Sequence, residues 1–196
     1  MAVSFSAKER SGIITALRRA ATRHAAVVGM RKTTVDELAL EAGISKGAFY
    51  KFYPSKEHLF LEVLEQWYQS ILDKAAQALQ ANASLPPRQR TAMMLKAAWR
   101  TMREQQLLRF CQEEIPLMIR KLPENLLQAQ YQSADEFVAR LIARAGVKFT
   151  VTESEACASF RILFLSLLTA SEVGMYYEKA LDGLIDAACD QLIRND

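Results

Sequence analysis

Cationic and hydrogen-bonding side chains gather in one short stretch of the sequence, where they could bind phosphates and the edges of bases. Lys46, Tyr50 and Lys51 lie close together, and Gly47 stands among them. On a helix that buries Phe49, these residues would point outward, within reach of a major groove. Ammonium and phenol groups are hydrogen-bond donors, which suits them to phosphate oxygens. The stretch therefore predicts contact with double-stranded DNA.

Two short helices joined by a sharp turn would position these side chains. Thr34 is a good N-cap for a helix whose apolar residues recur at helical spacing, and Gly43 would end that helix. Glycine suits this place because it tolerates the left-handed backbone at a helix end. Ser45 would cap a second helix, Lys46–Tyr53, and a long third helix would begin at Ser55. This spacing predicts a helix-turn-helix.

The distribution of charge agrees with a DNA-binding N-terminal part. The net charge of the chain is only +3. Residues 1–60 nevertheless carry ten Lys or Arg against five acidic residues, whereas the remainder has 15 basic and 17 acidic residues. Electrostatic positioning on a duplex requires positive charge on the part that meets the phosphates.

Composition excludes several other classes of protein. Of the 196 residues, 51% are apolar, which is ample for a packed core. Cys111, Cys157 and Cys189 show no metal or redox spacing, so we expect buried, reduced thiols. We see no nucleophile–base pair, phosphate loop or metal-ligand cluster, and we expect no enzyme, metal or cofactor. We expect a cytoplasmic protein without a membrane partner, because the N-terminus lacks an apolar signal sequence and the run Ile162–Leu168 is too short to cross a bilayer.

Helical spacing recurs along the whole chain, without a convincing period-two strand pattern. We therefore expect an all-α fold. Besides the helix-turn-helix, the expected helices cover residues 6–28, 55–81, 87–104, 106–121 with a kink at Pro116, 123–145, 152–173 and 175–193. The last two are unusually apolar, which suggests either a partner subunit or simple core packing.

The segment Thr33–Phe60, TTVDELALEAGISKGAFYKFYPSKEHLF, resembles the DNA-binding signature of TetR/AcrR-type transcriptional regulators. The resemblance implies an N-terminal three-helix domain in residues 1–54, continued by the first turns of the helix from residue 55. Residues 55–196 would form a larger helical domain that binds an effector and dimerises. Phe52 departs from the family pattern, which more often has a His or Tyr there that reaches the DNA backbone. The DNA contacts that the resemblance implies are Thr34, Ser45, Lys46, Gly47, Ala48, Tyr50, Lys51 and Lys56.

Residues of the second domain supply candidates for the effector and dimer sites. Large apolar or aromatic side chains on its helices are the candidates for an effector pocket: Trp99, Met102, Phe110, Met118, Tyr131, Phe137 and Phe160. The same side chains could equally form core. The dimer candidates lie on the last two helices: Phe160, Phe164, Leu168, Leu181, Leu184 and Ala188.

Together these patterns favour a homodimeric repressor that binds a palindromic operator and is released by a small, largely apolar effector. Two-fold symmetry would place the two recognition helices in major grooves roughly 34–36 Å apart, or a multiple of that distance. The alternative is a helical interaction or small-molecule-binding protein without specific DNA binding.

Overall fold

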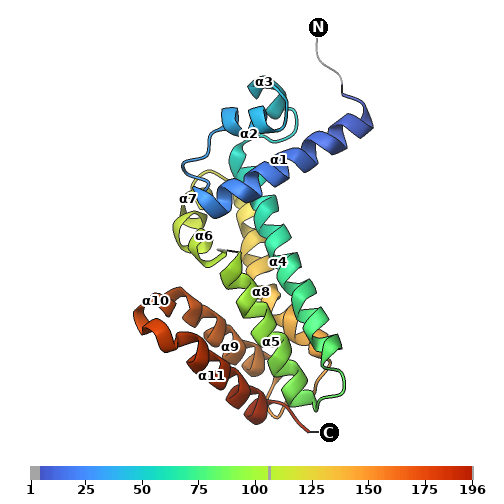
Figure 1. Cartoon of the computed structure of the whole chain (residues 1–196), viewed down its shortest axis with the longest axis vertical. Coiled ribbons are helices and arrows are strands. Elements are labelled where there is room, and N and C mark those ends of the chain that lie inside the picture. The colour runs from blue at the N-terminus through green and yellow to red at the C-terminus, as the bar shows by residue number, and fades with distance from the viewer. Residues whose placement is uncertain (1–4, 106, 196) are drawn as a thin grey trace. The chain divides into compact units, whose positions relative to one another are not determined.

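The computed structural model describes residues 5–105 and 107–195, and within them all side chains except those at 108, 119, 125 and 127–135. Regular structure in these residues is helical, apart from an isolated bridge between Phe149 and Ile193 (Figure 1). The predicted all-α fold is confirmed.

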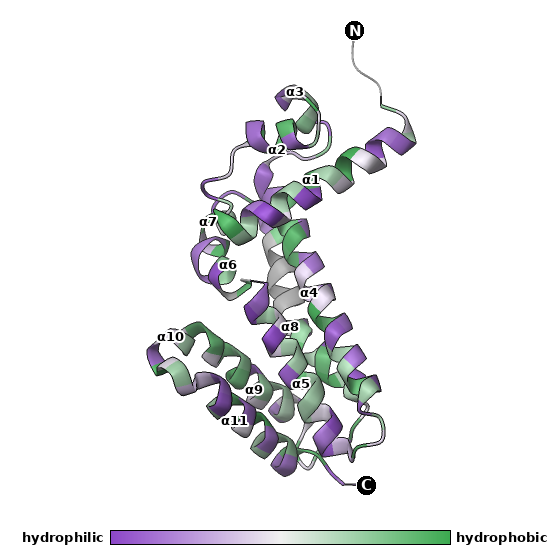
Figure 2. Cartoon of the chain, in the orientation of Figure 1, coloured by the Kyte–Doolittle hydropathy of each residue, from purple (hydrophilic) through white to green (hydrophobic). Residues whose placement is uncertain are grey.

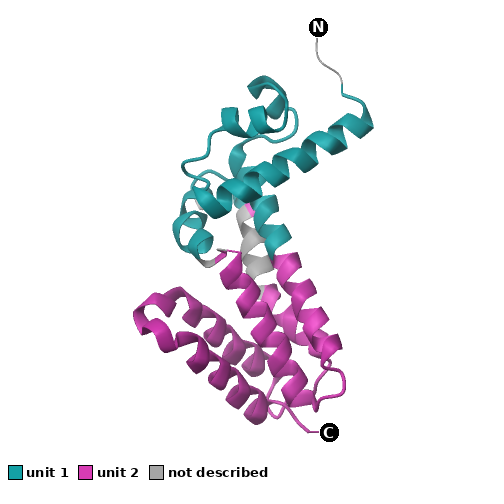
Figure 3. Ribbon diagram, in the orientation of Figure 1, with its two compact units in different colours: residues 1–67, 109–124 teal, residues 68–108, 125–196 magenta. Residues whose placement is uncertain are grey.

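The chain divides into two compact units (Figure 3). Unit 1 comprises residues 1–67 and 109–124, and unit 2 comprises residues 68–108 and 125–196. Unit 1 thus joins the predicted helix-turn-helix to a segment much later in the chain. The boundary between residues 54 and 55 separates the predicted DNA-binding domain from the predicted effector-binding and dimerisation domain, and it stays a prediction.

The helices of unit 1 surround the helix-turn-helix. They are α1 (Ala7–Val27), α2 (Val35–Glu41), α3 (Lys46–Phe49), the first part of α4 (Lys56–Ala81), most of α6 (Leu107–Glu113) and α7 (Ile115–Ile119). Unit 2 contains the remainder of α4, then α5 (Pro87–Glu104), nearly all of α8 (Glu124–Ala145), α9 (Glu153–Leu165), η1 (Ser166–Thr169), α10 (Ala170–Val173), η2 (Gly174–Tyr176) and α11 (Tyr177–Leu192).

Three helices begin with the same reciprocal cap. In each, a Ser or Thr hydroxyl accepts a hydrogen bond from the backbone N–H of a Glu three residues later, while the Glu carboxylate accepts from the capping residue. This capping box satisfies donors that a helix start otherwise leaves unpaired. The pairs are Ser6 with Glu9 in α1, Thr34 with Glu37 in α2, and Thr152 with Glu155 in α9.

Several predicted helices are shorter than expected or interrupted. The recognition helix α3 ends at Phe49 rather than Tyr53. The helix expected over residues 106–121 breaks at Glu114, because Pro116 enters the first turn of α7 and has no N–H to continue a helix. The helix expected over residues 152–173 is interrupted by the tighter turns of η1.

The core of the helix-turn-helix is made of fully buried side chains from four helices. Leu17 of α1, Leu38 of α2, Phe49 of α3 and Phe60 of α4 each have no exposed surface. Phe110 of α6 extends this core, since its ring stacks on that of Phe60 with 6.1 Å between the ring centroids. The packing fixes which face of α3 remains outside.

The segment Glu153–Leu192 is long and apolar enough to cross a membrane, judged by length and composition alone. In the structure it is not one straight helix, because Gly174, with a φ of 79°, separates α10 from η2 and α11. The helices α9 and α11 then pack against each other. Only 17% of an 18-residue apolar window within this segment is buried, so the segment leaves apolar surface exposed. Figure 2 shows how strongly apolar α9 is.

Leu38 and Leu40 offer a matched test of this packing, because they lie on one helix with opposite burial. Leu38 is fully buried, whereas Leu40 is 79% exposed. We expect Leu38→Ala to lower the free energy of unfolding by about 2–5 kcal/mol. Leu40→Ala should change it by less than about 0.5 kcal/mol. Urea denaturation followed by circular dichroism measures both, and equal losses would contradict the packing of α2.

Candidate nucleic-acid interface and apolar cavity

The turn between α2 and α3 has the geometry of a helix-turn-helix. Gly43 has a φ of 68°, in the left-handed region that glycine occupies without strain. The next residue, Ile44, donates its N–H to the carbonyl of Ala39 at 3.0 Å, which closes the end of α2. Ser45 then caps α3 by accepting from the N–H of Ala48 at 3.2 Å. The predicted turn residues therefore act as expected.

Most of the predicted DNA-contacting side chains lie on the outside of this unit. Tyr50 is 51% exposed, whereas Ala48 is only 8% exposed and packs inward beside Phe49. Direct contact of the Ala48 side chain with a base would be limited by that burial. The exposed residues are Thr34, Ser45, Lys46, Gly47, Tyr50 and Lys51.

Lys46 is already oriented by a neighbour. Its ammonium forms an ion pair with Asp36 of α2 at 2.7 Å, and this carboxylate raises the pKa of Lys46. The ammonium is therefore charged at neutral pH and held above the junction of α2 and α3. Both partners are mostly exposed, so the pair contributes little to stability and can rearrange when a phosphate or base arrives.

Lys56 occupies a different environment from the other predicted contacts. Its ammonium donates to the carbonyls of Met30 at 2.8 Å, Arg31 at 3.3 Å and Thr33 at 2.5 Å. An ammonium has three donors, and these three acceptors use them all. Burial lowers the pKa of Lys56. In this conformation Lys56 supports the loop before α2, and its phosphate contact stays a prediction that requires one of these bonds to be exchanged.

A buried carboxylate that the sequence did not single out for this role also holds the same loop. Glu114, 5% exposed at the break between α6 and α7, accepts from the backbone N–H of Arg31 at 3.0 Å. A Cβ at Gly29 would clash with the other carboxylate oxygen of Glu114, and the φ of 82° at this residue is one that glycine adopts without strain. Nothing in the local sequence pattern marks this contact, which joins residues far apart in the chain.

Two further charged groups fix α4 within unit 1. Glu57, 4% exposed, accepts from the ammonium of Lys121 at 3.0 Å. Glu62 accepts from the Tyr53 hydroxyl at 2.7 Å and from Arg18 of α1 at 2.6 Å. Burial and the bond to Glu62 raise the pKa of Tyr53, which keeps its hydroxyl a donor. Tyr53, which is 5% exposed, therefore belongs to the core.

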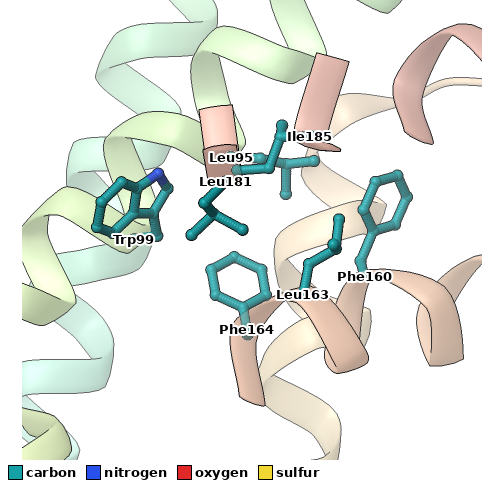
Figure 4. Close-up of a pocket in the computed structure, with 7 residues that line it drawn as sticks. All are labelled: Leu95, Trp99, Phe160, Leu163, Phe164, Leu181 and Ile185. Atoms are coloured by element: carbon teal, nitrogen blue, oxygen red, sulfur yellow. The ribbon is translucent and has the colours of Figure 1, made fainter. Parts of the chain in front are cut away.

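Unit 2 contains a closed apolar cavity between α5, α9 and α11 (Figure 4). Its free space is about 10 Å³, roughly the room for one water-sized sphere. Of the predicted effector residues, Trp99 and Phe160 line it. The other lining residues are Leu95, Leu163, Phe164, Leu181 and Ile185, which the search for large aromatic and Met side chains did not assign to a pocket.

The remaining effector candidates lie elsewhere. Phe110 packs edge-on to Trp67 in unit 1, with 5.3 Å between the ring centroids, and Met118 is buried in the same unit. Phe137 lies against Tyr68 in unit 2, at 5.2 Å. Met102 of α5 is 8% exposed and does not line the cavity, and the side chain of Tyr131 lies outside the described residues.

Ion pairs between α5 and α11 border the cavity. Lys96 pairs with Asp186 at 2.6 Å, and Arg100 pairs with Asp182 at 2.7 Å. Asp182 also accepts from the indole N–H of Trp99 at 3.3 Å. These charges lie outside the cavity, whose lining is wholly apolar.

Three of the predicted dimer residues are buried within their own chain, and the other three are at least partly exposed. Phe160, Phe164 and Leu181 are at most 9% exposed because they close the cavity of their own chain. Leu184 of α11 is 55% exposed, and Leu168 and Ala188 are partly exposed. The exposed apolar side chains of α9 are Ile162 and Leu165, at 67% and 53%.

Of the three thiols that we expected to be buried, that of Cys189 is buried, whereas Cys111 and Cys157 are half-buried. Burial raises the pKa of Cys111 to about 11 and that of Cys189 to about 12, and it also raises the pKa of Cys157. These thiols are therefore protonated and weakly nucleophilic at neutral pH. Within the described ranges, no group of three His, Cys, Asp or Glu side chains is arranged to hold a metal ion.

Comparison with known proteins also indicates a DNA-binding segment in the N-terminal part of the chain. Residues 17–63 match the family described as bacterial regulatory proteins, tetR family. YuxN of Bacillus subtilis (strain 168), an uncharacterized HTH-type transcriptional regulator, is 46% identical over 61 residues, covering 31% of this chain and 19% of that protein. The chain spans about a third or less of the length of the curated relatives it matches.

Two solved structures resemble nearly the whole chain. A regulator from Mesorhizobium loti MAFF303099, assigned to the TetR family, has a TM-score of 0.66 at 20% identity, covering 96% of both chains. RolR, solved in complex with its ligand resorcinol, has a TM-score of 0.58 at 17% identity, covering 93% of this chain and 89% of that one. At these identities the similarity shows the fold.

The capped α2 and the exposed α3 form a helix-turn-helix of the kind found in transcriptional regulators. Residues 17–63 thus resemble the DNA-binding segment of the tetR family, and the chain as a whole shares the fold of a solved structure assigned to that family.

The bonds of Lys56 to the loop generate a stability prediction. We expect Lys56→Met to lower the free energy of unfolding by roughly 1–3 kcal/mol, because it removes the ammonium that donates to the carbonyls of Met30 and Thr33, two buried residues. Lys32→Met, which removes an exposed ammonium from the same loop region, should change it by less than about 0.5 kcal/mol. Urea denaturation compares the two variants. Equal stability of both variants would show that the carbonyl contacts of Lys56 do not hold the loop.

The capping box of α2 makes the start of the helix-turn-helix sensitive to acid. Hydrogen bonds from the N–H and hydroxyl of Thr34 lower the pKa of Glu37 below 4.5. A lowered folded-state pKa contributes stability above the unfolded-state value, and that contribution is lost as the pH falls through the folded-state value. We therefore expect the wild-type chain to lose stability below about pH 4.5, and Glu37→Gln to remove part of this pH dependence.

The measurement is the midpoint of urea unfolding between neutral and acidic pH. Glu65→Gln, which replaces an exposed carboxylate on α4, is the control and should keep the wild-type profile. A Glu37→Gln profile parallel to the wild-type profile would contradict the role of the capping box.

Proposed function

We propose that this chain is a homodimeric repressor that binds a palindromic operator through α3 and is released by a small, largely apolar effector. The observation that carries the proposal is the capped helix-turn-helix of the TetR family with Lys46, Tyr50 and Lys51 exposed on its recognition segment. A cytoplasmic location is part of this proposal. The effector and dimer parts rest on separate features of unit 2.

Gly47 supports a close approach of DNA to α3. A Cβ at this position would meet no atom within 4 Å, and Gly47 does not have a positive φ. The fold itself therefore does not require glycine here, although glycine in a helix costs about 1 kcal/mol relative to alanine. Contact between the α3 backbone and a duplex explains this glycine.

The outer surface of α9 and α11 supports a dimer. Ile162, Leu165 and Leu184 expose more than half of their side-chain surface. Gly183, beside Leu184, also has open space around its Cβ position, which would let a helix of a second copy approach closely. In this proposal the partner meets these residues, while Phe160, Phe164 and Leu181 support them from inside.

The apolar cavity supports the effector part of the proposal. Its lining would favour an apolar or planar aromatic molecule over a sugar or phosphate. RolR, which shares the fold, was solved with the aromatic ligand resorcinol. Ligand pockets usually have about 300–1,000 Å³, so the closed cavity must open by moving α9 and α11 from α5. An effector that prefers the released state tenfold supplies only about 1.4 kcal/mol, so strong release requires greater preference.

Selection of bound fragments from genomic DNA, followed by fluorescence anisotropy over a range of salt, tests the proposal. We expect a site with two-fold related halves and an affinity that falls steeply as salt rises. Tyr50→Phe should weaken binding to all duplexes by removing a phosphate contact. Lys46→Ala should also relax the preference for particular bases, by about 1–3 kcal/mol at the positions it contacts.

Lys74→Ala on α4 is the control, because it removes an exposed ammonium away from α3 and should keep wild-type affinity. Failure of the purified wild-type chain to retain any duplex, after mass spectrometry has excluded a co-purified effector, would overturn the proposal.

A further inference from the structure

An aromatic and cationic stack lies immediately after the recognition helix. Phe52, three residues beyond the end of α3, lies half-buried against Phe5, with 5.5 Å between the ring centroids. The guanidinium carbon of Arg10 lies 4.9 Å from the centroid of the Phe52 ring. Arg10 comes from the second turn of α1, so the stack joins the N-terminal end of α1 to the end of the recognition segment.

The charge of Arg10 is not used inside the described chain. Its side chain is exposed, and no ion pair to an acidic group is found for it among the residues the structure describes. The neighbouring carboxylate of Glu9 is occupied by the N–H and hydroxyl of Ser6. A cation near the start of a helix is electrostatically unfavourable, so the helix gains nothing from this positive charge.

The stack fixes the orientation of the guanidinium while leaving its donors available. Stacking on a ring uses the flat face of the guanidinium, whereas its N–H groups point outward in its plane. Such a planar fork matches the oxygens of a phosphate. Phe52 has no polar atom, so it can hold the cation but cannot itself bind a phosphate.

We propose that Arg10, held on the ring of Phe52, forms a binding site for a backbone phosphate of duplex DNA. The site extends the surface of Tyr50 and Lys51 beyond the end of α3. It rests on the proposed DNA-binding function and adds a contact from α1 to it. The contact is with the phosphate backbone and carries no base preference.

The test compares Arg10→Gln with Arg19→Gln in the full-length chain. Both changes remove one positive charge from α1, but the nine-residue separation places the two side chains on opposite faces of that helix. The probe is a labelled duplex recovered by selection from a random-sequence library with the wild-type chain. We expect Arg10→Gln to weaken binding about tenfold, and equally for variant sequences. Arg19→Gln should bind as the wild-type chain does.

Salt dependence separates a phosphate contact from a packing role. Losing one phosphate contact per protomer should reduce the slope of log affinity against log salt by about 0.9 for each protomer bound. Phe52→Leu, which keeps an apolar side chain but removes the ring, should reproduce most of this loss. Adding Arg10→Gln to Phe52→Leu should then cost little more, because the two residues act as one unit.

The outcomes distinguish the two proposals. An Arg10→Gln chain with wild-type affinity and slope at every salt concentration overturns the Arg10 site alone. A lower unfolding midpoint with an unchanged salt slope would show that Arg10 only packs, and it also overturns the site. A wild-type chain that retains no duplex overturns both the proposed function and this inference.

Discussion

The helix-turn-helix depends on the ammonium of Lys56 and the backbone carbonyls of the loop before α2. Met30 and Thr33 are almost completely buried, and both carbonyls accept from Lys56, while the Met30 carbonyl also accepts from the N–H of Thr33. Buried backbone acceptors without donors are costly, so a donor from the first turn of α4 fixes the path of the loop. The position of α2 follows from that path, and α3 follows from α2 through the Gly43 turn.

The positive charges of unit 1 fall into two groups, those that bind groups inside the unit and those that are exposed. Lys56, Lys121 and Arg18 neutralise or pair with groups inside unit 1. Lys46 and Arg10, by contrast, are exposed and are held in place by Asp36 and by the ring of Phe52. The net positive charge of residues 1–60 therefore overstates the number of cations that can reach phosphates. Only the cations that the fold leaves exposed can contact a duplex.

In unit 2, the helices α9 and α11 each have an inner and an outer apolar face. The inner faces of α9 and α11 close the cavity against Leu95 and Trp99 of α5. The outer faces expose Ile162 and Leu184. Under the proposed function, an effector that separates the inner faces also moves the outer faces, because each helix is a stiff rod. Effector binding and dimer geometry would then be coupled without a separate transmitting element.

The sequence by itself determined the all-α fold, the helix-turn-helix and its turn residues, because capping, glycine punctuation and helical spacing act over three or four residues. The tertiary structure decided the roles of residues whose partners are distant in the chain. From the sequence, Lys56 is indistinguishable from a surface cation, and Glu114 is simply one of two adjacent acidic residues. Only the folded structure shows that both support the loop before α2. Likewise, periodicity identified Phe160, Phe164 and Leu184 as apolar positions on helices but could not tell the cavity face from the outer face, since that depends on where α5 packs.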